Sequence, residues 1–260
     1  MRIAVLLKQV PVSTDVAMDP VTHCLIRKNT EMAVNPADLH AVTAAILIRQ
    51  QCGGRITAFS MGPPEAESAL RTAVAMGADE AFLLSDKCFG GGDTLGTAKV
   101  LSAALTYCGG FDVVLAGSAS ADSATGQVGP MVAQLLGIPS IVDAGDVTLA
   151  GGHFSALRNG PDGAVLLRAA PPCLITMEPG SNQVILPTLR AQMKANHIQI
   201  PVLSNAQLAL DPNEIGRMGA KSVVVDTVIC PDTHRRARML EGTPQDMARR
   251  IWALLGEENL

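Results

Sequence analysis

A run of small and polar residues follows a short apolar segment near the middle of the chain. It extends from Gly117 to Pro130 and reads GSASADSATGQVGP, directly before a segment with helical periodicity. Small side chains let a phosphate approach the first turn of a helix, where free backbone N–H groups attract anions. Asp122 and Gln127 could bond a ribose or position the loop. The run is interpreted as a phosphate-binding loop, with a tightly packed structural turn as the alternative.

Three further loops have a similar composition and again lie between a predicted strand and a predicted helix. In Phe89–Thr94, which reads FGGGDT, Asp93 could cap the next helix or contact a nucleotide. The others are Ser60–Pro64 and Val34–Asp38. Four such loops at one sheet edge predict a nucleotide crevice. The residues predicted to bind the cofactor are Leu6, Lys8, Asn35, Ser60, Met61, Gly62, Asp93, Thr94, Gly117, Asp122, Thr125, Gly126, Gln127, Val128 and Gly129.

Short apolar runs alternate with helix-period segments, which is typical of a parallel sheet covered by helices. The sequence therefore predicts a Rossmann-like α/β fold. Turn signals between residues 148 and 167 predict antiparallel hairpin strands added to the sheet edge. The predicted strands are Arg2–Leu7, Arg55–Ser60, Ala81–Leu84, Asp112–Ala116 and Cys173–Met177, and the predicted helices are Pro36–Gln51, Pro63–Met76, Thr94–Tyr107 and Thr125–Leu136, with Asn35 and Asp93 as capping residues.

The C-terminal part of the chain has a different residue pattern from the part before it. A mixed polar stretch leads to an amphipathic segment over Pro244–Leu255, which predicts a terminal helix. We expect a nucleotide-binding domain over residues 1–200 and a C-terminal arm over residues 201–260. The arm could pack on another polypeptide or form an ordinary closing helix, and the pattern alone supports both.

Composition excludes several classes of function. The 260 residues carry a net charge of -4, and aromatic residues make up 3%, which argues against a nucleic-acid surface. The six cysteines form no C-x-x-C pair, so no metal site is predicted, and we expect them to be small buried side chains. The five histidines are isolated from one another and G-x-S-x-G is absent, which disfavours a self-contained hydrolase. Since no apolar run is long enough for a membrane span or a signal peptide, a cytoplasmic protein is expected.

Taken together, five motifs resemble the small (β) subunit of electron-transfer flavoproteins over essentially the whole chain. Their order and spacing carry the resemblance, and ALRTAVAMGAD is the most specific part. The motifs are VLLKQVP (Val5–Pro11), AVNPADLHAV (Ala33–Val42), SMGPPEAESALRTAVAMGADEA (Ser60–Ala81), DTLGTAKVL (Asp93–Leu101) and QVGPMVAQLLGIP (Gln127–Pro139).

The resemblance implies an adenine nucleotide alpha hydrolase-like fold and an electron-carrier subunit without catalytic residues of its own. It implies an α subunit that holds FAD, electron exchange with a flavin-dependent dehydrogenase, and FAD or AMP in the crevice of this chain. Asp19–Arg27, Ser85–Thr94 and the QVGP sequence look more like the electron-bifurcating members, in which the second flavin oxidises NADH. Those members have a more acidic loop where this chain has Ala121–Gly126.

A second departure from the family lies at Glu178–Ile185, which replaces the usual Asn-Glu-Pro-Arg-Tyr stretch. The following Leu186–Ala195 still matches the recognition loop, whose leucine enters a pocket of the dehydrogenase, and Leu189 falls at that position. The altered flank predicts a nonstandard dehydrogenase partner. The competing hypothesis is a stand-alone adenine-nucleotide-binding module of the universal-stress type, which would need neither FAD nor a second chain.

Overall fold

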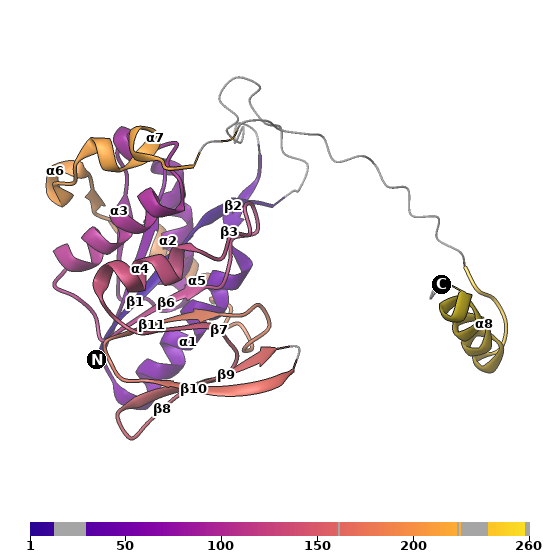
Figure 1. Cartoon of the computed structure of the whole chain (residues 1–260). Coiled ribbons are helices and arrows are strands. Elements are labelled where there is room, and N and C mark those ends of the chain that lie inside the picture. The colour runs from indigo at the N-terminus through magenta and orange to yellow at the C-terminus, as the bar shows by residue number, and fades with distance from the viewer. Residues whose placement is uncertain (13–29, 161, 223, 225–238, 258–260) are drawn as a thin grey trace. The chain divides into compact units, whose positions relative to one another are not determined.

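The computed structural model describes residues 1–12, 30–160, 162–222, 224 and 239–257, and its core is a parallel sheet of seven strands (Figure 1). The strand order is β12–β5–β4–β1–β6–β11–β7, and every neighbouring pair is parallel. This arrangement confirms the predicted Rossmann-like α/β class. The strands are β1 (Arg2–Leu7), β4 (Arg55–Met61), β5 (Glu80–Leu84), β6 (Val113–Gly117), β7 (Ser140–Ala144), β11 (Cys173–Met177) and β12 (Val202–Leu203).

Four helices cover the two faces of this sheet. α1 (Pro36–Cys52) and α2 (Glu67–Met76) share one hydrophobic cluster with the strand residues Ile3, Val5 and Leu7. α3 (Thr94–Tyr107) and α4 (Val128–Leu136) pack in a second cluster with Ala4 and Leu6. Ile3–Leu7 of β1 are all buried and alternate between the two clusters, which explains the nearly continuous apolar run of this strand.

The order of the strands reverses beside β1. From β1 the chain builds β4 and then β5 on one side, whereas β6 lies on the other side. Ligands of open α/β sheets bind outside the carboxyl ends of the strands at such a switch point. The fold therefore directs attention to the loops that follow β1, β4 and β6.

Two smaller antiparallel sheets accompany the main sheet. β2 (Gln9–Pro11) pairs with β3 (Met32–Val34), and this pair was not predicted. β8 (Val147–Ala150), β9 (His153–Gly160) and β10 (Gly163–Ala169) form a three-stranded sheet. The hairpins were predicted correctly, but their addition to the edge of the main sheet was wrong. The buried Phe154 and Ala156 of β9 instead pack into the cluster of α1 and α2.

Short elements follow β11. The helix α5 (Leu189–Asn196) precedes β12, and α6 (Asn205–Leu208) and α7 (Gly216–Gly219) come after it. Three 3-10 turns complete the described part, η1 (Pro64–Ala66), η2 (Lys87–Phe89) and η3 (Pro212–Glu214). Within the described residues, no helix is long and apolar enough to cross a membrane.

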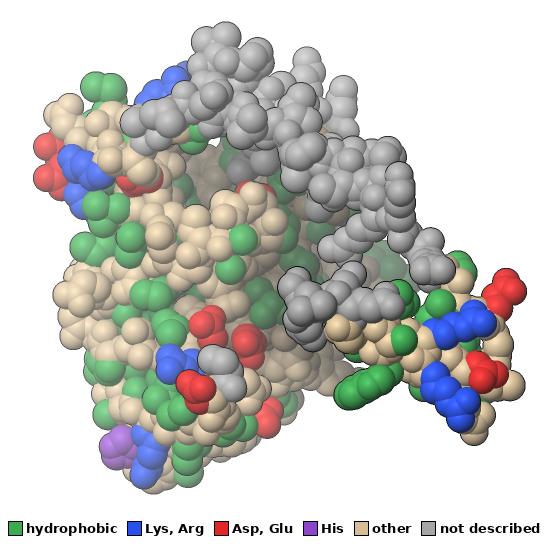
Figure 2. Space-filling view, turned by 45° about the vertical axis from the view of Figure 1, so that its right-hand side comes forward, with side chains coloured by type: hydrophobic (Ala, Val, Ile, Leu, Met, Phe, Trp, Pro, Cys, Tyr) green, Lys and Arg blue, Asp and Glu red, His purple; other side chains and the backbone are tan. Residues whose placement is uncertain are grey.

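The chain divides into a unit at Met1–Val225 and a second unit at Asp226–Leu260. The second unit contains α8 (Pro244–Glu257), which confirms the predicted terminal helix. Hydrophobic side chains gather along one side of α8 and charged ones along the other (Figure 2). β12 joins the main sheet beyond residue 200. The division at residue 200 into a nucleotide-binding domain and a partner-binding arm stays a prediction.

Candidate functional site

The carboxylate of Asp38 bridges the carboxyl ends of β1 and β6 at the switch point of the sheet. Its Oδ2 accepts the N–H of Lys8, the first residue after β1, at 2.7 Å. Its Oδ1 accepts the N–H of Gly117, at the end of β6, at 3.1 Å, and the side-chain amide of Asn35 at 2.9 Å. Two backbone donors that would face a ligand in many α/β proteins are therefore occupied by a carboxylate of the protein itself.

Burial has a large effect on this carboxylate. Asp38 is 5% exposed, and burial raises its pKa to about 7 although the bonds from Asn35, Lys8 and Gly117 act in the opposite direction. Gly117 is required for the close approach, because a Cβ there would lie 2.3 Å from Asp38 Oδ1. Sequence reasoning missed the role of Asp38. The available signal was an acidic residue three positions after Asn35, in the first turn of a helix whose next two turns are mostly apolar.

Asn35 connects the start of α1 to the loop that follows β6. Its side chain donates to the Ala119 carbonyl at 2.9 Å and accepts the Ala121 N–H at 3.0 Å. It makes no capping bond to α1, so the prediction of a capping side chain was wrong at this position. The amide is instead used to shape the loop that was predicted to bind phosphate.

An ion pair spans the loops after β1 and β6. Lys8 Nζ lies 2.6 Å from Asp122 Oδ1 and 3.2 Å from Ser120 Oγ. Burial alone would raise the pKa of Asp122, but the bonds from Lys8 and Ser120 and the Lys8 charge outweigh it, so the pKa lies below its ordinary value. The Lys8 side chain keeps 38% of its surface exposed, whereas that of Asp122 keeps 8%. The lysine is thus the accessible member of the pair.

The helix after the small-residue loop begins later than predicted. α4 starts at Val128 rather than Thr125, because Gly126 has a φ of 63°, which a right-handed helix does not allow. The first helical amides are therefore those of Val128 and Gly129, since Pro130 has no N–H. Gly129 is buried against β11, where a Cβ would lie 2.5 Å from Thr176 Cγ2.

The loop before α3 meets the loop before α4. Thr94 Oγ1 donates to Gln127 Oε1 at 2.9 Å, which brings two of the predicted site residues together. Asp93 caps α3 as predicted, because its Oδ1 accepts the Gly96 N–H at 2.9 Å. Its Oδ2 accepts the N–H groups of Lys221 and Ser222 at 2.7 and 3.1 Å. Both oxygens of Asp93 are thus engaged within the protein.

The predicted site residues on or directly after β1 and β4 are mostly buried or bonded within the protein, unlike the exposed residues before α4. Leu6 is 6% exposed and belongs to the hydrophobic core, and Met61 packs against the same cluster. Gly62 donates its N–H to the Leu84 carbonyl. Ser60 is fully buried at the carboxyl end of β4, beside Leu7 of β1, and its hydroxyl has no hydrogen-bond partner in the described structure. Such a buried hydroxyl is unusual and is compatible with a ligand at this edge.

Leu189 lies at the first position of α5 rather than in a loop. It is 73% exposed, and Thr188 caps the helix by accepting the Ala191 N–H at 3.2 Å. Leu186 and Met193 are also exposed, at 78% and 60%. We call these three side chains the α5 face. The structure shows that the face is accessible, whereas its role in partner binding stays a prediction.

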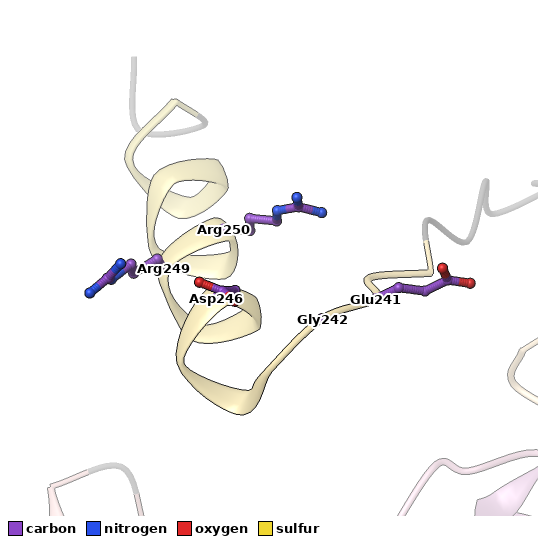
Figure 3. Close-up of a pocket in the computed structure, with 5 residues that line it drawn as sticks. All are labelled: Glu241, Gly242, Asp246, Arg249 and Arg250. Carbon is purple, nitrogen blue, oxygen red and sulfur yellow. The ribbon is translucent and has the colours of Figure 1, made fainter.

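Two hollows lie elsewhere on the described surface. One, of about 280 Å³, is lined by Glu241, Gly242, Asp246, Arg249 and Arg250 beside α8 (Figure 3). In the close-up the two arginines point away from each other. A groove of about 510 Å³ lies between α3, α4 and residues 207–214. Neither contains a predicted cofactor residue. Within the described residues no cluster of three or more His, Cys, Asp or Glu side chains could hold a metal ion.

Of the cysteines in the described part, Cys173 is buried as expected. Cys88 and Cys108 are partly exposed and Cys52 is exposed, so the expectation of buried thiols was wrong for Cys52. The segment Asp19–Arg27, on which the expected likeness to the bifurcating members partly rests, lies outside the described residues.

Fold and sequence together identify the class of protein. The chain has a Rossmann-like parallel sheet with small-residue loops at its switch point, and residues 22–208 match the family model "Electron transfer flavoprotein domain". The chain therefore belongs to the electron transfer flavoprotein family. Beta subunits of this family are electron carriers.

The chain is similar to several beta subunits over nearly its whole length. It is 38% identical to the electron transfer flavoprotein subunit beta of Thermoanaerobacterium thermosaccharolyticum, over 96% of both chains. Identity to the beta subunit of Megasphaera elsdenii is 38% over 86% of both chains. The Caffeyl-CoA reductase-Etf complex subunit CarD of Acetobacterium woodii is 34% identical over 94% of this chain and 93% of its own. These matches confirm the predicted family and favour the carrier over a universal-stress module.

Proposed function

We propose that this chain is the β subunit of a heterodimeric electron-transfer flavoprotein and that its crevice binds an adenine nucleotide. The observation that carries the proposal is the meeting of the loops after β1 and β6 at the switch point, with the first amides of α4 beside them. The family membership supports the same reading. An α subunit would hold the FAD that exchanges electrons with a flavin-dependent dehydrogenase.

The geometry favours a phosphate position at α4 rather than at the crevice floor. Asp38 occupies the amides of Lys8 and Gly117, and a phosphate there would face a buried carboxyl group. The amides of Val128 and Gly129 start a helix, where the helix dipole favours an anion by roughly 0.3–1 kcal/mol. The Lys8 ammonium group supplies a positive charge at the same edge, shared with Asp122.

The exposed residues before α4 and one buried hydroxyl support the proposal of an adenine nucleotide. Thr125, Gly126 and Gln127 are exposed in front of α4 and offer small or hydrogen-bonding side chains. The buried, unpartnered Ser60 hydroxyl lies at the neighbouring strand end. When bound, a flavin would supply the redox chemistry, whereas this chain would bind it and set its electrostatic surroundings.

We propose FAD as the nucleotide, with AMP as the alternative. The support is the QVGP sequence and the SDKCFGGGDT segment, together with the relative named as part of a Caffeyl-CoA reductase-Etf complex. If this chain acts in bifurcation, the flavin in its crevice would accept electrons from NADH. The changed loop at Ala121–Gly126 makes a direct measurement necessary.

The partner surfaces proposed are the α5 face and α8. Leu189 would enter a pocket of the dehydrogenase, and the altered Glu178–Ile185 segment would select a nonstandard one. α8 would pack on the α subunit through its apolar side, where Ile251, Trp252 and Leu255 are 48%, 80% and 54% exposed. A cytoplasmic location remains part of the proposal.

The deciding experiment is a count of nucleotides per heterodimer. The chain is co-expressed with its α partner, the complex is denatured, and the released flavin and AMP are quantified. Two flavins and no AMP are expected. One flavin plus one AMP would refute FAD in this crevice and keep the β-subunit assignment, whereas no nucleotide beyond the α-subunit flavin would refute the crevice.

A further inference from the structure

A histidine of α1 holds the segment between β11 and α5. The Gly180 N–H donates to His40 Nε2 at 3.0 Å, and His40 Nδ1 lies 3.0 Å from Asn182 Oδ1. The Asn182 side-chain amide donates in turn to the His40 carbonyl at 2.9 Å. We call these three contacts the His40 clasp. They join α1 to the Glu178–Ile185 segment, which departs from the family pattern.

The partners of the clasp determine the protonation of the ring. A backbone N–H can only donate, so His40 Nε2 must accept from Gly180, and the ring proton must lie on Nδ1. A backbone carbonyl can only accept, so Asn182 must point its NH₂ group to the His40 carbonyl and its oxygen to Nδ1. Both assignments agree, and the clasp therefore requires a neutral imidazole in the Nδ1–H form.

A second protonation would break the clasp. In an imidazolium ring Nε2 also carries a proton, which would then face the Gly180 N–H. Two donors cannot form the hydrogen bond, and the ring or the segment must move. Asn182 could still accept from Nδ1–H. Acid would thus release the Gly180 side of the clasp first.

The segment leads directly to the α5 face. Ile185 donates its N–H to Thr43 Oγ1 at 3.2 Å, and Val184 and Ile185 pack against the cluster of α1 and α2. Leu186 is the next residue and is 78% exposed. His40 and Thr43, one turn apart on α1, therefore hold the segment from which the α5 face projects.

We propose that His40 is a positioning residue for the α5 face and that its protonation loosens Glu178–Ile185. The partner role of that face rests on the proposed function, whereas the clasp does not. The charged groups of α1 are Asp38 and Arg49, those of α2, which packs against it, are Glu67 and Arg71, which pair with each other, and Glu178 follows β11.

Nuclear magnetic resonance of the full chain tests the clasp directly. The ¹⁵N spectrum of His40 should show the Nδ1–H tautomer near pH 8, and amide exchange at Gly180, corrected for its intrinsic rate, should become about tenfold faster as the ring protonates. His40→Phe keeps a ring but lacks the acceptor, so fast exchange is expected at both ends of the pH range. His153→Phe, at the exposed first position of β9, is the matched control and should behave like the unmodified chain.

Further variants separate the possible outcomes. If His40→Phe does not fold, Asn182→Ala leaves the ring in place and should still shift the tautomer equilibrium and weaken Gly180 protection. Leu189→Ala should leave Gly180 exchange unchanged while weakening dehydrogenase binding, so a failed partner face and a failed clasp are distinguishable. An Nε2–H tautomer, or Gly180 protection independent of pH in the unmodified chain, would overturn the proposal.

Discussion

Replacement of Asp38 by asparagine should remove a large pH dependence of stability near neutral pH. The carboxyl group is buried between β1, β6 and α1, and its pKa is raised from 3.8 to about 7. In this pH range the folded chain binds a proton that the unfolded chain has released. The stabilisation is therefore complete below about pH 4 and is lost as the pH rises towards 7.

The size of the effect follows from the pKa difference. A shift of about three units at about 1.4 kcal/mol per unit gives roughly 4 kcal/mol in all. Most of it, on the order of 3 kcal/mol, is lost between about pH 4 and about pH 7. Asparagine is uncharged like the protonated carboxyl group, but its NH₂ group would face an N–H donor where Asp38 has an accepting oxygen, which adds a cost that does not depend on pH. At about pH 4 the Asp38→Asn variant should be no more stable than the unmodified chain. Between about pH 4 and about pH 7 its free energy of unfolding should rise by about 3 kcal/mol relative to that of the unmodified chain.

Urea unfolding followed by circular dichroism at several pH values measures this difference. Asp162→Asn, an exposed carboxylate in the β9–β10 turn, serves as the control and should change the pH slope little. A constant difference between the Asp38→Asn variant and the unmodified chain would refute the reasoning. A slope of the opposite sign would show that the three hydrogen bonds outweigh burial and that the folded-state pKa is low.

Four further outcomes are expected. Gly126→Glu should place a negative charge before α4 and expel the nucleotide, so full nucleotide content after purification would move the site elsewhere. Lys8→Met should weaken binding of AMP in calorimetry, whereas Asp122→Asn should not, since it removes the competing charge. Leu189→Ala should raise the dissociation constant for the dehydrogenase about 30-fold, or about 2 kcal/mol, with unchanged flavin content; unaltered affinity would remove it from the interface. Gly117→Ala should destabilise the chain by about 2 kcal/mol or more in urea unfolding, because its Cβ would collide with the Asp38 carboxylate; a loss under about 0.5 kcal/mol would contradict this.

The buried elements could be predicted from the sequence with small errors at their ends. β1, β6 and β11 are apolar runs buried on both faces, and the pattern leaves few alternatives for them. β12 could not be predicted in this way because it has two residues, of which Val202 is exposed. β2 and β3 are equally short, and their pairing depends on residues far apart in the sequence.

Parts of the candidate site depend on backbone conformation and long-range contacts, which the spacing of residues along the sequence does not reveal. Composition indicated the loop before α4, but not the left-handed Gly126 that delays the helix to Val128. Asn35 and Asp93 both occupy the N-cap position of a helix as predicted, yet only the Asp93 side chain makes a capping bond, because that of Asn35 bonds to the loop after β6. His40 looked isolated because Gly180 and Asn182 lie about 140 positions away in the sequence.

α1 links the two regions that the proposed function requires. Its first turn carries Asp38, which holds the ends of β1 and β6, and the next turn carries His40, which holds Gly180 after β11. The helix is long and buried along much of its length, so it is held firmly against the sheet. For His40 this contact requires the neutral ring, because its Nε2 accepts the Gly180 N–H. The ends of β1 and β6 and the base of the α5 face are thus positioned by the same helix, through side chains that accept backbone N–H groups.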